Sequence, residues 1–213
     1  MPSLRVNEIF YSLQGETSRS GLRTVFVRLT GCPLRCSYCD TEYAFHEGRS
    51  MEMDEILGEV GKHAAHYVTV TGGEPLAQKH CLLLLEALCD QGYSVSLETG
   101  GAMDISKVDG RVSRIVDIKT PGSIEESKNL WSNLDWLNGN DEIKFVLTDR
   151  ADYEWARSVF EERRLGAIAP VLFSPAQGML HPKDLAEWIL EDGLEVRMQI
   201  QLHKLIWGNE PGH

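Results

Sequence analysis

Residues 31–40 read GCPLRCSYCD and hold three of the chain's five cysteines, Cys32, Cys36 and Cys39. The C-x3-C-x2-C spacing lets three thiolates converge on one centre from a single loop. A structural zinc site normally has four protein ligands, and an ordinary iron–sulfur cluster has four cysteines. The nearest fourth candidate is His46, and the chain has no second C-x2-C pair. The set therefore favours an iron–sulfur cluster with one open iron, a catalytic position, over a zinc loop completed by His46 or three unrelated thiols.

The remaining cysteines, Cys81 and Cys89, lie on or beside the apolar face of a predicted helix, so we expect them in the core. The first residues, MPSLR, lack the basic and apolar regions of a signal peptide, which favours a cytoplasmic location. Five cysteines in a cytoplasmic chain do not indicate a disulfide framework.

Composition limits the class of protein. The chain has 213 residues, 42% hydrophobic and 25% charged, which is typical of one soluble domain spanning residues 1–213. It has 32 acidic and 21 basic residues, a net charge of −11 and no dense basic patch, so we expect no nucleic-acid partner. No apolar run is long enough to span a bilayer, so we expect no membrane partner.

Strand-like runs rich in Val and Ile alternate with amphipathic stretches along the chain. This alternation predicts an α/β fold with a mostly parallel sheet, either open or curled into a barrel. Seven strands with few crossover helices favour an abbreviated, partial TIM-type (β/α) barrel. Predicted strands are residues 25–29, 67–71, 94–98, 114–118, 142–147, 167–172 and 196–202; predicted helices are 51–62, 80–91, 151–164 and 183–191, and 122–141 is irregular.

The unusual residues fall at the carboxyl ends of the predicted strands. The cysteine loop follows the first, Gly72-Gly73-Glu74-Pro75 the second and Glu98-Thr99-Gly100-Gly101 the third. Ligands of parallel α/β folds gather at these ends. Paired glycines let the backbone approach a ligand closely, and Glu74 can face an ammonium group.

The cysteine spacing, with Tyr38 before the last cysteine, resembles the radical S-adenosylmethionine superfamily, and the GGEP segment looks like its glycine-rich segment. The resemblance implies a [4Fe–4S] cluster whose open iron binds S-adenosylmethionine. One electron then cleaves the cofactor to a 5′-deoxyadenosyl radical, which abstracts a hydrogen atom from the substrate. It implies cofactor contacts at Tyr38, Gly72, Gly73, Glu74, Gly101, Lys144, Phe145, Val146 and Ser174. For Phe145, a place in the core is an equal alternative.

Five segments narrow the resemblance to one family within this superfamily. They are similar to segments of the 7-carboxy-7-deazaguanine synthase family and comprise residues 12–16, 26–29, 39–41, 98–100 and 201–204. That family implies a carbon–nitrogen lyase that contracts 6-carboxy-5,6,7,8-tetrahydropterin to 7-carboxy-7-deazaguanine with loss of ammonia, a step toward queuosine. It also implies Mg²⁺, a homodimer and an external one-electron reductant such as a flavodoxin. The implied substrate-binding residues are Leu13, Gln14, Gly15, Glu16, Arg28, Thr99 and His203.

Three of these implied positions have a competing interpretation. Arg28 is suited to a bidentate pair with a substrate carboxylate, although a surface salt bridge would also account for it. Thr41 supplies a hard oxygen ligand for Mg²⁺ with Asp40 behind it, unless both only cap a turn. His203, expected on a terminal strand, is a substrate contact or a structural residue.

Two rival functions share the cysteine motif. A glycyl-radical activase acts on a protein backbone and does not need Arg28 and Thr41 arranged for a small anion. A non-catalytic iron–sulfur or zinc module would bind a partner and would need neither S-adenosylmethionine nor the GGEP segment.

Overall fold

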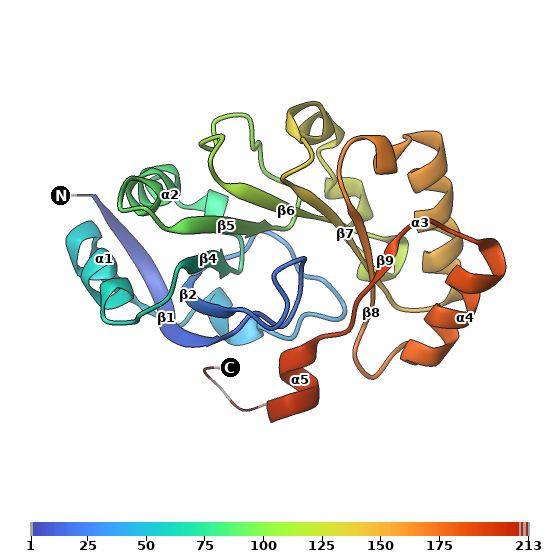
Figure 1. Ribbon diagram of the computed structural model, residues 1–213, viewed down its shortest axis with the longest axis horizontal. Helices are drawn as coiled ribbons and strands as arrows, with labels where there is room; N and C mark the ends of the chain where they lie inside the picture. The colour runs from blue at the N-terminus through green and yellow to red at the C-terminus, as the bar shows by residue number, and fades with distance from the viewer. Residues whose placement is uncertain (1, 209, 211, 213) are drawn as a thin grey trace.

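The computed structural model describes residues 2–208, 210 and 212. Its strands form one curved sheet. Its strands are β1 (Ser3–Leu13), β2 (Arg23–Leu29), β3 (Arg49–Glu52), β4 (Tyr67–Gly72), β5 (Ser94–Thr99), β6 (Ser113–Ile118), β7 (Glu142–Leu147), β8 (Val171–Pro175) and β9 (Arg197–Met198). The order is β3-β1-β2-β4-β5-β6-β7-β8-β9 (Figure 1). In this sheet order, each strand from β2 to β9 is parallel to the next, whereas β1 is antiparallel to both of its neighbours, β2 and β3. The mostly parallel, partial-barrel prediction is confirmed.

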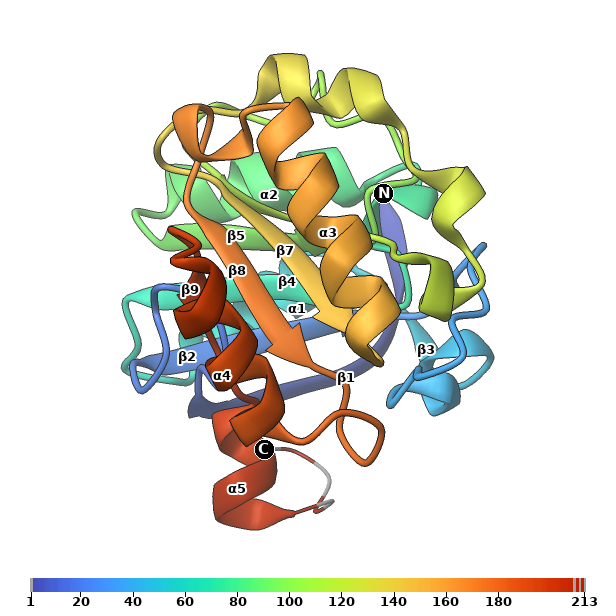
Figure 2. The same ribbon diagram turned by 90° about the vertical axis from the view of Figure 1, so that its right-hand side faces the viewer.

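The helices are α1 (Met53–Gly61), α2 (Cys81–Asp90), α3 (Arg150–Glu162), α4 (Pro182–Asp192) and α5 (Leu202–Trp207). Four of the helices cover the outer face of the sheet in two groups, α1 with α2 and α3 with α4, whereas α5 lies apart from both (Figures 1 and 2). The side chain of Asp149 caps α3, and α4 begins with Pro182 and ends before Gly193, whose φ of 56° suits a helix terminus. No helix in the described part of the chain is long and apolar enough to cross a membrane.

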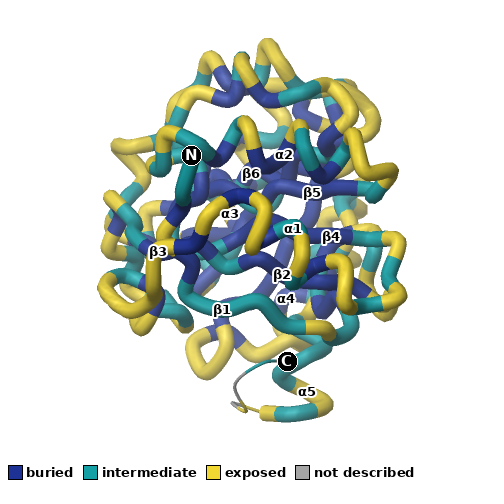
Figure 3. The backbone as a smooth tube through the Cα atoms, turned by 90° about the vertical axis from the view of Figure 1, so that its left-hand side faces the viewer, coloured by how far each residue is buried: buried dark blue, intermediate teal, exposed yellow. Residues whose placement is uncertain are grey.

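The core has two apolar clusters on the outer face of the sheet. One joins α1 and α2 to strands β1, β2, β4 and β5, and includes Ile56, Leu85 and Val70. The other joins α3 and α4 to β7 and β8, and includes Tyr153 and Phe173. Figure 3 shows the central strands buried beneath exposed loops. Because most apolar side chains pack outward against helices, the inner face of the curve has room for polar side chains, which it carries beside apolar ones such as Phe26 and Ile115.

The structure adds two strands and corrects three boundaries. Strands β1 and β3 were not predicted, and residues 51–52, expected to begin the first helix, belong to β3. The strand expected at 167–172 begins only at Val171, because residues 165–167 form a 3-10 turn. The strand expected at 196–202 is wrong beyond β9. This edge strand pairs only with β8, and the chain then turns so that the Leu202 amide bonds to the Gly15 carbonyl, where α5 begins.

Candidate active site

A cavity of about 720 Å³ lies inside the curve of the sheet. Alternate strand positions point to the same face, and five neighbouring strands place charged or hydroxyl side chains on its wall. These are Arg28 of β2, Thr71 of β4, Glu98 of β5, Asp117 of β6 and Lys144 of β7. The cysteine loop, the loop after β1 and the segment around α5 complete the lining.

Cys32, Cys36 and Cys39 all line this cavity and are partly buried. Burial raises the pKa of the three thiols, that of Cys36 to about 11, so binding a metal centre must displace their protons. Across the described residues, no three His, Cys, Asp or Glu side chains are gathered as ligands of one metal ion. A cluster does not require such convergence, because each thiolate binds its own iron atom.

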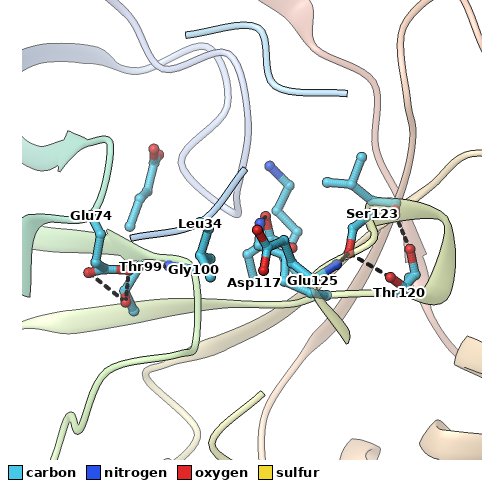
Figure 4. A network of polar contacts seen from close by, with 12 residues as sticks. Leu34, Glu74, Thr99, Gly100, Asp117, Thr120, Ser123 and Glu125 are labelled. Atoms are coloured by element: carbon cyan, nitrogen blue, oxygen red, sulfur yellow. Dashed lines mark hydrogen bonds and ion pairs between the residues drawn. The ribbon is translucent and has the colours of Figure 1, made fainter. Parts of the chain in front are cut away.

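The cysteine loop is held by the irregular segment after β6. The Ser37 amide donates to the Ser123 carbonyl at 3.1 Å, and the Ser37 hydroxyl to the Gly122 carbonyl at 2.6 Å. The Arg35 amide donates to Glu125 Oε1 at 2.5 Å. Figure 4 shows Ser123 bonded in turn to Thr120. The sequence had indicated only an irregular stretch here, so this role was missed.

The glycine-rich segment approaches the cysteine loop closely. A Cβ on Gly73 would lie 2.3 Å from the Gly31 carbonyl oxygen and 2.8 Å from Cys32 Cβ, so only glycine fits there. Gly72 and Gly73 line the cavity, but Glu74 does not. Its fully buried carboxylate instead accepts from the Thr99 hydroxyl, the Gly100 amide at 2.7 Å and the Leu76 amide at 3.1 Å (Figure 4).

Residues 13–16, which we call the cavity floor, run from the last residue of β1 into the loop before β2 and line the cavity. Gln14 is buried, with Nε2 at 3.3 Å from both Thr69 Oγ1 and Glu98 Oε1. Glu16 forms an ion pair with Lys144. Burial alone would raise the pKa of Glu16, but the charge and hydrogen bond of Lys144 bring it below its ordinary value.

The segment around α5 joins the floor to the end of the cysteine loop. Gln201 Nε2 donates to Glu16 Oε1 at 3.0 Å and to Asp40 Oδ2 at 3.3 Å. Asp40 also accepts from the Thr41 hydroxyl at 2.8 Å and lies 3.6 Å from Lys204 Nζ. His203 lines the cavity from α5 rather than from a strand, and a Cβ on Gly15 would lie 2.1 Å from its Nδ1.

Arg28 forms a salt bridge, as one interpretation expected, and it also lies where the other interpretation requires it, at the cavity wall. It lines the cavity, and its Nε also lies 2.8 Å from Glu8 Oε1 in a salt bridge. Its guanidinium packs 5.6 Å from the centre of the Phe10 ring and 5.9 Å from that of Tyr43. The arginine is thus pre-oriented at the cavity wall with donors beyond the one used by Glu8.

The other predicted residues divide into two groups. Leu13, Tyr38, Thr99, Val146 and Ser174 line the cavity. Gly101 and Phe145 do not: Gly101 turns with φ of 74°, and Phe145 is fully buried with its ring 5.3 Å from that of Phe173. The core interpretation of the Phe145 side chain therefore accounts for its position.

Comparisons with known proteins agree with this geometry. Residues 26–120 match the family model of the radical SAM superfamily. The 7-carboxy-7-deazaguanine synthase of Koribacter versatilis is 45% identical, over 97% of this chain and 98% of its own. That of Chlorobaculum tepidum is 47% identical, over 96% of this chain and 94% of its own. The chain belongs to the 7-carboxy-7-deazaguanine synthase family.

A solved structure supports the same fold. The crystal structure of QueE from Escherichia coli superposes on this chain with a TM-score of 0.79 and 23% sequence identity. The match covers 94% of this chain and 95% of the QueE chain. Membership of the radical SAM superfamily implies a [4Fe–4S] cluster and S-adenosylmethionine. The site of this synthase family member fits both, because three thiols line one wall and Gly72 and Gly73, which carry no side chain, lie beside them.

Several cavity residues of this family member were missed from the sequence: Glu98, Asp117, Lys119, Gln201 and Lys204. Lys119 is buried, with its Nζ 2.7 Å from Asp117 Oδ2 and 5.8 Å from the centre of the Tyr38 ring. The alternation of polar residues along β5, ending at Glu98, was a usable signal for an inward-facing polar row. Gln201 and Lys204 lie in the segment 201–204 that carries the family resemblance, but their residue types alone did not indicate that they face the cavity.

Proposed function

We propose that this chain contracts 6-carboxy-5,6,7,8-tetrahydropterin to 7-carboxy-7-deazaguanine with release of ammonia, a step toward queuosine and other deazapurines. The observation that carries the proposal is one cavity lined by the three cysteines, the paired glycines and a charged floor. The names of the relatives support the product. Loss of ammonia accounts for every atom removed, so the conversion needs no net oxidant.

Residues in different parts of the cavity have different roles in this reaction. When bound, the cluster and S-adenosylmethionine supply the radical that takes a hydrogen atom from the substrate. Cys32, Cys36 and Cys39 hold the cluster, and Gly72 and Gly73 leave room for the methionine end of the cofactor. Glu74 fixes the Thr99–Gly100 turn from behind, so that Thr99 meets the substrate in a defined place.

Arg28 would bind the substrate carboxylate, and Thr41 would hold a Mg²⁺ ion that supplies further positive charge beside it. Because the chain carries a net charge of −11, an anionic substrate needs locally placed positive charge. Thr41 and Asp40 both line the cavity, and their oxygens are ligands that Mg²⁺ prefers. We expect the enzyme to work in the cytoplasm as a homodimer, with electrons from a one-electron donor such as a flavodoxin.

The metal site has its own test. Thr41→Ala should lower the rate and weaken its dependence on Mg²⁺, while Thr41→Ser, which keeps the hydroxyl, should behave like wild type. Cluster absorbance and cofactor cleavage without substrate should be unchanged in both. If Thr41→Ala responds to a Mg²⁺ series as wild type does, Thr41 is not a ligand and only caps its turn.

The reaction itself is tested anaerobically. Reconstituted protein is incubated with S-adenosylmethionine, Mg²⁺, a reductant and the carboxypterin, and the products are analysed by mass spectrometry. We expect a product lighter than the substrate by one ammonia, with ammonia released in equal amount. Cofactor cleavage without conversion of the pterin would favour a different radical enzyme, such as an activase. Absence of cofactor binding would favour a non-catalytic iron–sulfur module.

A further inference from the structure

Charged side chains around the cavity are paired, with one exception. The pairs are Glu16–Lys144, Arg28–Glu8, Asp40–Lys204 and Asp117–Lys119. Glu98 also lines the cavity, yet within the described residues it has no oppositely charged group at salt-bridge distance. Glu98 is partly buried, and a carboxylate withdrawn from water without a counter-charge is costly, so its ionised form needs hydrogen-bond donors in place of a counter-charge.

The protein satisfies Glu98 only in part. The Thr71 hydroxyl donates to Oε2 at 2.8 Å, and Gln14 Nε2 lies 3.3 Å from Oε1, beyond the usual range. A carboxylate can accept about four hydrogen bonds. The neighbouring Glu74, which does not line the cavity, accepts from two backbone amides and a hydroxyl. Glu98 therefore keeps acceptor capacity on the side that faces the cavity.

The electrostatics of the site agree with this geometry. Burial raises the pKa of Glu98, and repulsion from Glu16 raises it further. Lys144, whose charge opposes this shift most strongly, is already engaged by Glu16. Donors on a bound ligand would stabilise the ionised form, as protein donors do for other buried carboxylates.

The position of Glu98 relative to Arg28 suits a flat heterocycle. Arg28 pairs in register with Thr71, and Thr71 bonds to Glu98, so the three lie at one level across β2, β4 and β5. Two strand spacings separate Arg28 from Glu98, about 10 Å. A two-ring compound whose carboxylate is held at Arg28 can reach Glu98 with its far edge.

We infer that Glu98 is a specificity-determining residue that accepts the ring N–H and the exocyclic amino group of the pterin. This inference rests on the proposed function. The two donors lie side by side on the 2-amino-pyrimidinone edge and match the two oxygens of a carboxylate, as a guanidinium does. Glu16 is less available for this role, because Lys144 and Gln201 already occupy its oxygens.

The test compares two non-reacting ligands on the reconstituted enzyme with S-adenosylmethionine and Mg²⁺. Pterin-6-carboxylate keeps the amino group, whereas lumazine-6-carboxylate replaces it with a carbonyl that would face Glu98. Wild type should bind the pterin at least roughly 100-fold more tightly, because the carbonyl meets an acceptor. Glu98→Gln should weaken pterin binding roughly 10–100-fold and, by donating to the carbonyl, largely remove the preference.

Two further variants separate recognition from structure. Glu98→Asp keeps the charge and should retain the preference for the pterin at reduced affinity. Glu142→Gln is the matched control: Glu142 is a buried carboxylate at the start of β7 that does not line the cavity, so both affinities should be unchanged. Binding is read from the fluorescence of the pterin and lumazine rings, without turnover.

Two results would overturn the inference: equal binding of both ligands by wild type, or a Glu98→Gln variant that loses affinity for both while keeping the ratio. The second would make Glu98 a structural residue. Failure of the proposed function looks different, because the carboxypterin would then not be converted even if the Glu98-dependent preference were present. Conversion without the preference would leave the function standing and remove only the role of Glu98.

Discussion

The cysteine loop and the cavity floor line the same cavity, but the protein holds them by different means. The loop is fixed largely through its main chain: the Gly31 amide donates to the Ala44 carbonyl and the Ser37 amide to the Ser123 carbonyl. The floor also has main-chain bonds, such as that of the Leu202 amide to the Gly15 carbonyl, but its polar side chains are held by remote side chains, as Glu16 is by Lys144, 128 residues away. A loop held by its backbone keeps its shape whatever surrounds its thiols, whereas the floor depends on charges that a substrate also meets. We therefore assign cofactor chemistry to the loop and substrate recognition to the floor.

The largest expected effect tests which cysteines of the loop bind the cluster. Changing Cys36 to Ala should abolish the iron–sulfur absorbance and all activity, because three thiolates are the minimum for a cluster with one open iron. Cys81→Ala should keep the absorbance, since Cys81 is fully buried in the core and does not line the cavity. Loss of the cluster in Cys81→Ala, shown by anaerobic reconstitution and absorption spectra, would break the three-ligand assignment.

The next effect tests the substrate side. Arg28→Ala should raise KM for the carboxypterin strongly, since a charged hydrogen-bonded partner in a desolvated site is worth roughly 2–5 kcal/mol. Glu8→Gln is the matched control, because it weakens the salt bridge but leaves the guanidinium at the cavity wall. We expect steady-state kinetics to show a near-normal KM for Glu8→Gln. If instead both variants lose only stability and keep KM, Arg28 serves the salt bridge alone.

The smallest expected effect concerns the stability of the folded protein, to which the carboxylates of Glu16 and Glu98 should contribute with opposite sign. The pKa of Glu16 is lowered in the folded protein, so its ionised form stabilises the fold above the ordinary pKa and that contribution is lost only in acid. Glu16→Gln should therefore lower the free energy of unfolding by about 1–3 kcal/mol, equally at pH 6 and pH 8. The pKa of Glu98 is raised, so its ionisation opposes folding as pH rises through that value. Glu98→Gln should stabilise the protein, more at high pH than at low pH.

Thermal unfolding midpoints of the three proteins across this pH range provide the measurement, since about 1 kcal/mol shifts the midpoint by about 2–4 °C in a chain of this size. A Glu98→Gln variant less stable than wild type at every pH would mean that the protein, rather than a ligand, makes use of that carboxylate.

Much of the cofactor side could be predicted from the sequence because its signals are local. The cysteine spacing lies within eight residues, and the glycine pair follows a strand whose Val and Thr pattern is plain. The floor could be placed only through family resemblance, because its partners are remote: Gln14 meets Glu98 across 84 residues and Glu16 meets Gln201 across 185. The strand predicted at 196–202 ends early, and no helix was predicted at 202–207, because the apolar residues of so short a stretch carry no helix signal. Its conformation follows from docking onto Gly15, a tertiary contact.

The division of labour is tested most directly by a pair of glycine variants. A side chain on Gly73 would strike the cysteine loop, whereas one on Gly15 would strike His203. S-adenosylmethionine affinity, cofactor cleavage without substrate and formation of the deazaguanine product are measured for Gly73→Val and Gly15→Val. We predict that Gly73→Val loses all three, while Gly15→Val loses only product formation, by roughly 100-fold for a displaced substrate contact. The assignment of cofactor chemistry to the loop and of substrate recognition to the floor would be contradicted by either of two results. One is a Gly15→Val variant that loses as much cofactor cleavage as Gly73→Val, and the other is a Gly73→Val variant with unchanged S-adenosylmethionine affinity.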